Sequence, residues 1–367
     1  MLLKKGKMFD LSKPDHSIFE SKKLDLYSPV NYSGLEKSVS NLVAEGPSRT
    51  VLTSSGTAAI HTLIVSAGLD SNCIILCPSS TFGATVFPFL ERSIPVYFYD
   101  LEIPSLSPAV ASLNQCLSSI SIEEKLDSRT RIVLVVVDNY GADCLPGHVR
   151  EWAYHNSVSI IVDAAESLGK RPCRSDSNIL GIVTSFNGNK IISGFGGGAL
   201  TLFDETTERI ARSYIDQGKV EGAAGYAYKL VGNNLRINPM SAILISQQIS
   251  DIKYLVNLRT ERFKSYLGLF NDNGLEFESV GGKDNTHWLS VFLITGQSRD
   301  RLTKALANID AEFRYCWRPL YKSDPFFHCR TADVKGSERL FTEGICLPSG
   351  RGIENLYFQR LADELAS

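Results

Sequence analysis

Short apolar runs alternate with segments of helical spacing through the middle of the chain. The runs that predict strands are Thr50–Thr53, Ile74–Leu76, Pro95–Tyr99, Ile132–Val137, Val158–Val162, Val183–Phe186 and Ala199–Phe203. Residues 132–137 are rich in β-branched side chains, which is typical of a strand buried on both faces. Helical spacing over 58–67 and 147–155 lies between these runs. The alternation predicts an α/β domain with a mainly parallel sheet.

The last third of the chain repeats this alternation on a smaller scale. Residues 242–270 predict one long helix, and shorter strand and helix patterns follow it. A chain of 367 residues is also too long for one ordinary domain. We therefore expect an N-terminal segment and a large domain over residues 1–245. A long connecting helix and a small C-terminal domain are expected over residues 246–367.

Composition narrows the class of protein. The net charge of −2 gives no reason to expect nucleic acid or an anionic membrane as a partner. The eight cysteines form no CxxC pair, so we expect reduced thiols in a cytoplasmic protein and no metal site. The first sixteen residues place charges where a signal peptide needs its apolar region, and no apolar run approaches the length of a membrane span.

The hexapeptide Glu354–Gln359 resembles the cleavage site used to remove affinity tags. It is therefore either native sequence or an engineered scar. Leu356, Phe358, Leu361 and Leu365 recur at roughly helical spacing, which predicts a terminal helix through this segment.

Candidate chemistry gathers where the predicted strands end. Ligands of such sheets bind at the carboxyl ends of the strands, and Phe82, Asp163, Ser185 and Lys190 all fall at or just beyond such ends. Lys190 comes before a glycine cluster at 194–198, where backbone or ligand can approach closely. A lysine amine in such a place can form a Schiff base with an aldehyde cofactor, or it can be a plain loop lysine.

A second candidate is the helix that follows the strand at 50–53. Ser54, Ser55 and Thr57 are good capping residues, and a helix start presents free N–H groups with positive dipole character. This predicts a phosphate site, with an ordinary N-cap as the alternative.

Seven separated blocks of the sequence match one known pattern. They run in order as Ser55–Ala59, Thr81–Thr85, Val162–Glu166, Ser185–Lys190, Gly232–Arg236, Trp317–Leu320 and Leu347–Gly350. With these blocks the chain resembles the DegT/DnrJ/EryC1/StrS sugar aminotransferases over nearly its whole length. The Ser-Phe-Asn-Gly-Asn-Lys form and the Glu312-x-Arg314-x-x-Trp317 block resemble the branch that aminates nucleotide-linked 4-keto sugars.

The resemblance implies a fold and a cofactor. The fold is the pyridoxal 5'-phosphate (PLP) transferase fold type I, with a large, mainly parallel seven-stranded sheet domain and a smaller C-terminal α/β domain. Lys190 would hold PLP as a Schiff base and later act as acid and base. Asp163 would keep the ring nitrogen protonated. Phe82 would stack on the ring, with core packing as the alternative. Glu166 would lie near the phenolic oxygen of the ring, with an exposed turn carboxylate as the alternative.

The resemblance also implies the phosphate contacts. Gly56, Thr57 and Ala58 would offer the helix start, and Ser185 would offer a hydroxyl. Asn234 aligns with a residue that reaches the phosphate from the neighbouring subunit, which implies a homodimer with shared active sites. Simple turn chemistry is the alternative for Asn234.

The implied activity is transamination of a nucleotide-linked keto-sugar, such as a UDP- or dTDP-4-keto-6-deoxy sugar. L-Glutamate would be the amino acid donor, and the amino sugar would serve polysaccharide, glycan or secondary-metabolite synthesis. Arg236 and Tyr321 are candidate substrate contacts. The chain departs from the family pattern at Asn233, Leu235, Arg318 and Tyr321, so its substrate can differ from that of relatives. The alternatives are a lyase or amino-acid transaminase of the same fold, and a regulatory relative that binds PLP without turnover.

Overall fold

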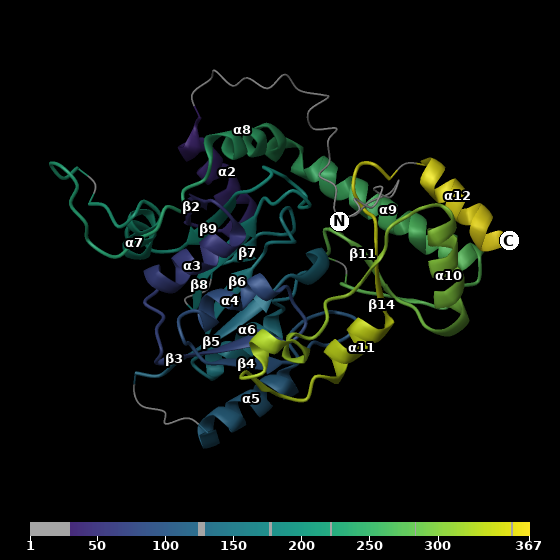
Figure 1. Cartoon of the computed structure of the whole chain (residues 1–367), viewed down its shortest axis with the longest axis horizontal. Helices are drawn as coiled ribbons and strands as arrows, with labels where there is room; N and C mark the ends of the chain where they lie inside the picture. The colour runs from purple at the N-terminus through teal and green to yellow at the C-terminus, as the bar shows by residue number, and fades with distance from the viewer. Residues whose placement is uncertain (1–29, 124–128, 176–177, 221, 283, 354) are drawn as a thin grey trace.

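The computed structural model describes residues 30–123, 129–175, 178–220, 222–282, 284–353 and 355–367. The N-terminal segment, for which no signal peptide is predicted, lies outside these residues. Two main sheets organise the described chain, one of eight strands and one of four. Figure 1 shows the large sheet with its helices on the left and the C-terminal helices gathered on the right.

The large sheet has the strand order β13-β4-β3-β5-β6-β8-β9-β2. Its strands are β2 (Arg49–Thr53), β3 (Cys73–Pro78), β4 (Val96–Tyr99), β5 (Arg131–Val137), β6 (Ser159–Asp163), β8 (Ile179–Ser185), β9 (Gly198–Leu202) and β13 (Arg330–Thr331). Neighbours from β13 to β8 run parallel, and β9 and β2 pair antiparallel at one edge. The predicted mainly parallel α/β sheet is confirmed.

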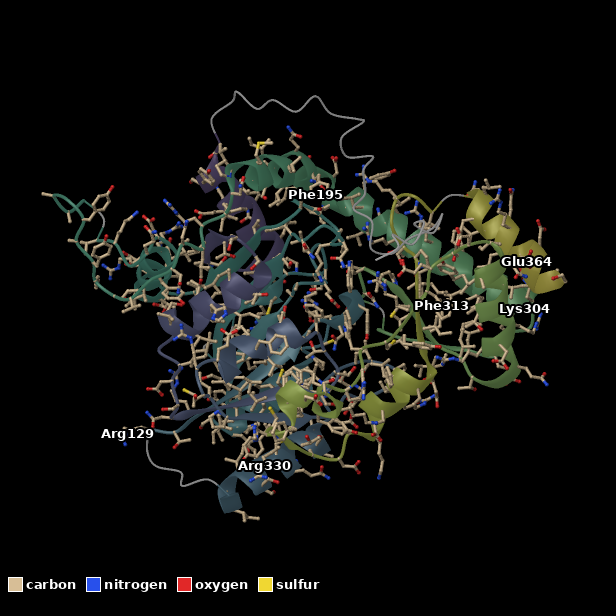
Figure 2. All side chains as sticks on the ribbon, viewed as in Figure 1. Arg129, Phe195, Lys304, Phe313, Arg330 and Glu364 are labelled. Atoms are coloured by element: carbon tan, nitrogen blue, oxygen red, sulfur yellow. The ribbon has the colours of Figure 1, made fainter. Side chains whose placement is uncertain are left out.

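The sheet has eight strands where seven were expected. The additional strand, β13, is two residues long and comes from the C-terminal part of the chain to pair with β4. Its labelled residue Arg330 lies at the lower edge of the molecule in Figure 2. So short a strand has no period-2 pattern to detect, which is why the sequence did not predict it.

Both faces of the sheet are covered, as the continuous apolar strands predict. In β3, Ile74 and Leu76 pack into a cluster on one face, while Ile75 and Cys77 pack into a cluster on the other. The first cluster includes residues of α2 (Tyr32–Val43), α5 (Val110–Glu123) and α6 (Gly147–His155). The second includes residues of α3 (Gly56–Ser66), α4 (Phe87–Leu90) and α7 (Glu205–Ile215). A small parallel pair joins β1 (Ala44–Glu45) to β7 (Cys173–Arg174).

The helix expected over residues 242–270 is two helices. Its N-terminal part is α8 (Pro239–Gln248) and its C-terminal part is α9 (Ile252–Asp272), with a 3-10 turn at Ile249–Asp251 between them. The side chain of Gln248 bonds both the N–H and the carbonyl of Ser193, which fixes the end of α8 on the large domain. The expectation of one helix was wrong, because no proline or glycine in the sequence marks the break between α8 and α9. The domain boundary at residue 245 would fall within α8 and stays a prediction.

The C-terminal part contains an antiparallel sheet of order β10-β11-β14-β12. Its elements are β10 (Glu278–Ser279), β11 (Ser290–Leu293), α10 (Gly296–Asn308), β12 (Arg314–Tyr315), α11 (Lys335–Glu343), β14 (Gly344–Leu347) and α12 (Asn355–Ala366). Side chains from α9, α10 and α12 form a third apolar cluster with β11 and β14.

The predicted terminal helix is confirmed as α12, but its apolar stripe differs by one position. Tyr357, Leu361 and Leu365 are buried, whereas Leu356 is exposed. The hydroxyl of Tyr357 bonds that of Tyr266 in α9, so this part of the hexapeptide belongs to the C-terminal core. Among the helices described, none is long and apolar enough to cross a bilayer.

Candidate active site

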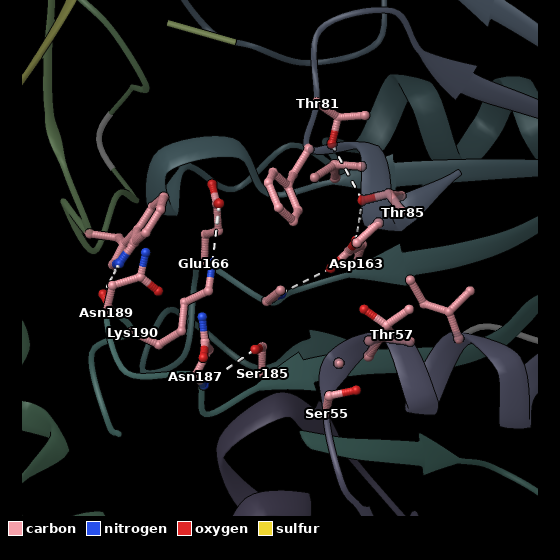
Figure 3. Close-up of a pocket in the computed structure, with 18 of the residues that line it drawn as sticks. Ser55, Thr57, Thr81, Thr85, Asp163, Glu166, Ser185, Asn187, Asn189 and Lys190 are labelled. Carbon is pink, nitrogen blue, oxygen red and sulfur yellow. Dashed lines mark hydrogen bonds and ion pairs between the residues drawn. The ribbon is translucent and has the colours of Figure 1, made fainter. Parts of the chain in front are cut away.

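A cavity of about 190 Å³ opens at the carboxyl ends of β3, β6 and β8 (Figure 3). The candidate residues that line it are Gly56, Thr57, Phe82, Asp163, Glu166, Ser185 and Lys190. These come from four separate segments of the chain. The fold therefore brings together most of the residues proposed from sequence, at the strand ends where parallel sheets bind ligands.

Lys190 lies in the turn after β8, and its amine points into the cavity. Its Nζ is 3.2 Å from Oε1 of Glu166 and 4.1 Å from the ring centroid of Trp288. The backbone N–H of Lys190 donates to the carbonyl of Asn187, which closes the turn. The amine is therefore held between a carboxylate and an aromatic face.

Asp163 is the last residue of β6 and is buried. Burial raises the pKa of its carboxyl group, and the hydrogen bond from Thr85, the N–H of Ala165 and the charge of Lys190 oppose that rise. The Thr85 hydroxyl donates to Oδ2 at 2.8 Å, and the Ala165 N–H donates to Oδ1 at 3.1 Å. These bonds fix the carboxylate at the cavity wall, where a cationic group of a ligand would stabilise it.

Glu166 sits on the same turn as Asp163. Burial raises the pKa of its carboxyl group, while Lys190 and the N–H of Tyr140 counteract this. Oε2 accepts the Tyr140 N–H at 2.8 Å. The described cavity wall thus carries two carboxyl groups and one amine, and it suits a ligand that brings a positive ring atom.

The helix start of α3 forms the opposite end of the cavity, where Figure 3 places Ser55 and Thr57. Ser55 caps the helix by accepting the N–H of Ala58 at 3.0 Å. The first-turn N–H groups of Gly56 and Thr57 have no acceptor within a helix, so they are suited to bind an anion. A Cβ on Gly56 would lie 3.1 Å from Cβ of Ser185, so glycine allows the helix start to approach β8.

The phosphate contact of Ala58 stays a prediction, and its position in the described structure differs from that of Gly56 and Thr57. Its N–H is already used by the cap, and it is absent from the residues that line the cavity. The family resemblance had implied a phosphate contact for Ala58 along with Gly56 and Thr57. The hydroxyl of Ser185, by contrast, lines the cavity and accepts the N–H of Asn187, which leaves its proton free to donate to a ligand.

Phe82 presents an open ring to the cavity. The side chain is 58% exposed, and its ring centroid lies 5.5 Å from that of Trp317. Trp317 stacks in turn on Tyr140, and the backbone N–H of Trp317 donates to the Tyr140 hydroxyl. The ring of Phe82 is therefore positioned to cover one face of a planar ligand.

Three other candidates lie away from the cavity lining of the described chain. Asn234 is exposed and pairs with Asp216 in a single β-bridge. Arg236 makes an ion pair with Asp216 at 3.1 Å. The Tyr321 hydroxyl donates to Glu338. Asn234 and Arg236 lie in the segment between α7 and α8, part of which projects from the body of the molecule at the left of Figure 1.

Sequence reasoning missed several residues of this site. Thr85 and Trp317 fell inside recognised blocks, but neither was given a role. Tyr140 and Trp288 belonged to no block. The signal that places them is spatial, because Thr85, Trp288 and Trp317 line the cavity and Tyr140 bonds Glu166 from segments distant in sequence.

No group of three or more metal-ligating side chains occurs in the described ranges.

Comparison with known proteins identifies the family of this chain. A family model described as the DegT/DnrJ/EryC1/StrS aminotransferase family matches residues 20–366. EpsN of Bacillus subtilis (strain 168), provisionally named a pyridoxal phosphate-dependent aminotransferase, is 32% identical over 308 residues, which are 81% of this chain and 77% of EpsN.

Two further proteins extend the similarity. GDP-perosamine synthase of Caulobacter vibrioides is 24% identical over 324 residues, covering 86% of this chain and 84% of that protein. The crystal structure of a DegT DnrJ EryC1 StrS aminotransferase from Brucella abortus superposes with a TM-score of 0.79. It is 20% identical, with coverage of 95% of this chain and 92% of that one.

Proposed function

The chain belongs to the DegT/DnrJ/EryC1/StrS aminotransferase family, and from this premise we propose that it transfers an amino group from an amino acid to a nucleotide-linked keto-sugar. It is a PLP-dependent aminotransferase, and the resemblance identified from sequence is confirmed. The finer proposal is a UDP- or dTDP-4-keto-6-deoxy sugar as acceptor and L-glutamate as donor. The product would be an amino sugar for a polysaccharide, a glycan or a secondary metabolite.

The charged and polar groups of the cavity suit PLP. The helix start at Gly56 and Thr57 suits the phosphate, and the buried carboxyl of Asp163 suits the ring nitrogen. Bound there, the cofactor supplies an aldehyde for amine exchange and a ring that withdraws electrons from the substrate Cα. Lys190 would attach the cofactor and, once released, would carry the proton between donor and acceptor atoms.

The observation that carries the proposal is the shared cavity of Lys190 and Asp163. An amine nucleophile and a fixed buried carboxylate face one space, with an anion-binding helix start beside them. The name GDP-perosamine synthase describes a relative that makes a nucleotide-linked amino sugar, which supports the same substrate class here. Contacts of Arg236 and Tyr321 with substrate, and the cytoplasmic location, stay predictions.

We propose in addition that the active form is a homodimer with shared active sites. Asn234 is not among the residues that line its own cavity, and it lies in the segment between α7 and α8, where it pairs with Asp216. Apolar side chains on the same segment are unusually open to solvent, with Tyr226 80% and Val231 92% exposed. A second copy of the chain would cover these side chains and receive Asn234 at its phosphate site.

Subunit mixing tests the shared site. Lys190→Ala and Asn234→Ala are each expected to reduce activity strongly when purified alone. Co-refolded mixtures of the two variants should regain part of the activity, because one site of each mixed dimer then carries both native residues. Stable mixed dimers that regain no activity would contradict the shared site.

Half-reaction assays test the substrate class. Glutamate should convert the bound cofactor to its amino form, and a nucleotide-linked 4-keto sugar should restore the original absorbance. Restoration by keto acids alone would favour an amino-acid transaminase. Loss of substrate without amine transfer would favour a lyase, and absence of any conversion would favour a regulatory relative.

A further inference from the structure

Trp288 reaches the cavity from the C-terminal part of the chain, just before β11. Its side chain is 5% exposed, and it lines the cavity beside Lys190. The indole N–H donates to the carbonyl of Asn189 at 2.6 Å. This bond ties the ring to the turn that carries Lys190, so the ring and the amine keep a common position.

The Lys190 amine lies over the face of this ring. Nζ is 4.1 Å from the ring centroid, within the range at which the negative face of an indole attracts a cation. Glu166 lies 3.2 Å from the same Nζ. Because the site is shielded from water, the attraction is stronger than at an exposed surface.

We propose that Trp288 acts on the reacting amine itself, by holding the Lys190 ammonium during the part of the cycle in which the lysine is not bonded to the cofactor. This inference rests on the proposed function. An indole ring has no lone pair available to take the proton, so it stabilises the charge while the proton stays on Lys190. Glu166 supplies the opposite charge, and the two groups together define one resting position for the amine.

A purely structural role is the competing explanation, since Trp288 also packs in the apolar cluster on one face of the large sheet. Such a role predicts that substitutions change stability alone. A role in holding the charge predicts that the reactivity of the Lys190 amine changes even when the shape of the ring is kept.

An isosteric replacement separates the two roles. Tetrafluorotryptophan placed at position 288 keeps the shape and the N–H but removes most of the negative ring face. In the cofactor-free full-length chain, acetic anhydride should then acetylate Lys190 about twofold to thirtyfold faster at a fixed neutral pH, because the ring attracts the ammonium less strongly. Mass spectrometry of the peptide that contains Lys190 measures the rate, with Lys335 as an internal standard.

The matched control is the same replacement at Trp317. That indole also lines the cavity, but its ring contacts are with Phe82 and Tyr140. Its fluorination should leave the acetylation rate of Lys190 unchanged. Equal rates for wild type and the fluorinated Trp288 protein would overturn the proposal.

Two simple variants extend the test. Trp288→Phe keeps a ring face without the N–H, and Trp288→Leu removes both, so acetylation should rise in the order wild type, W288F, W288L. The same rate in W288L as in wild type would also contradict the proposal. Failure of the wild-type protein to bind PLP would refute the proposed function, whereas unchanged acetylation in a protein that binds PLP would refute this inference.

Discussion

Thr85→Val removes the side-chain donor that holds Asp163 in its ionised form. The Thr85 hydroxyl donates to Oδ2 at 2.8 Å, and both residues are buried. Valine keeps the shape of the side chain but cannot donate. The change therefore tests whether this bond compensates for burial of the carboxylate.

The magnitude follows from the charge on the acceptor. A hydrogen bond to a charged group contributes about 1.5–3 kcal/mol, so the variant should lose about that much free energy of unfolding while Asp163 is ionised. Burial already raises the pKa of Asp163, and loss of the Thr85 bond raises it further. In the cofactor-free chain the folded state therefore binds the proton more tightly than the unfolded state does.

The raised pKa of Asp163 determines how the stability changes with pH. The pKa of Asp163 is higher in the folded state than in the unfolded state. This carboxyl group therefore lowers the stability of the fold as the pH rises from the unfolded-state pKa through the folded-state pKa. The cost of T85V should be full at mildly alkaline pH, where the carboxylate is charged. It should shrink as the pH falls below the folded pKa and the protonated carboxyl no longer needs the donor.

Urea denaturation of the cofactor-free protein at several pH values measures this cost. Thr184→Val is the matched control, because its buried hydroxyl has no hydrogen-bond partner among the described residues. T184V should be close to neutral at every pH. Equal losses in the two variants, or a T85V loss that does not depend on pH, would refute the reasoning.

Three further predictions concern other parts of the molecule. Asp163→Asn should keep the fold but lose most transaminase activity, because the ring nitrogen loses its charge partner; a mild loss in steady-state assays would mean that another carboxylate serves it. Lys170→Met should cost about 3–5 kcal/mol in denaturant unfolding, since it leaves the buried Asp138 without its cation, whereas Lys335→Met at an exposed pair should change little. Tyr357→Ala should cost about 3–5 kcal/mol by the same measurement if the hexapeptide is part of the core as the structure has it.

The strand ends and the helix start were predictable because local pattern determines them. Continuous apolar runs end at Asp163 and Ser185, and a capping serine follows the strand at 50–53. Parallel strands bring such ends to one edge of a sheet, so residues distant in sequence could be placed together in advance.

Other features depend on tertiary contacts that leave no local pattern. The two-residue strand β13 exists because β4 offers a free edge, and the break between α8 and α9 coincides with the contact of Gln248 to Ser193. Trp288 belongs to no sequence block, and the ring meets the Lys190 amine only after folding. The roles of Asn234 and Arg236 require a second chain or a substrate, which is why one chain leaves them as predictions.

Trapping the cofactor on its lysine tests the central claim most directly. The protein is loaded with PLP, treated with borohydride to fix any Schiff base, digested and analysed by mass spectrometry. We predict an absorbance band near ~420 nm before reduction and a single pyridoxyl adduct on Lys190 afterwards, both absent in Lys190→Ala. An adduct on another lysine, or wild-type turnover by Lys190→Ala, would contradict the account.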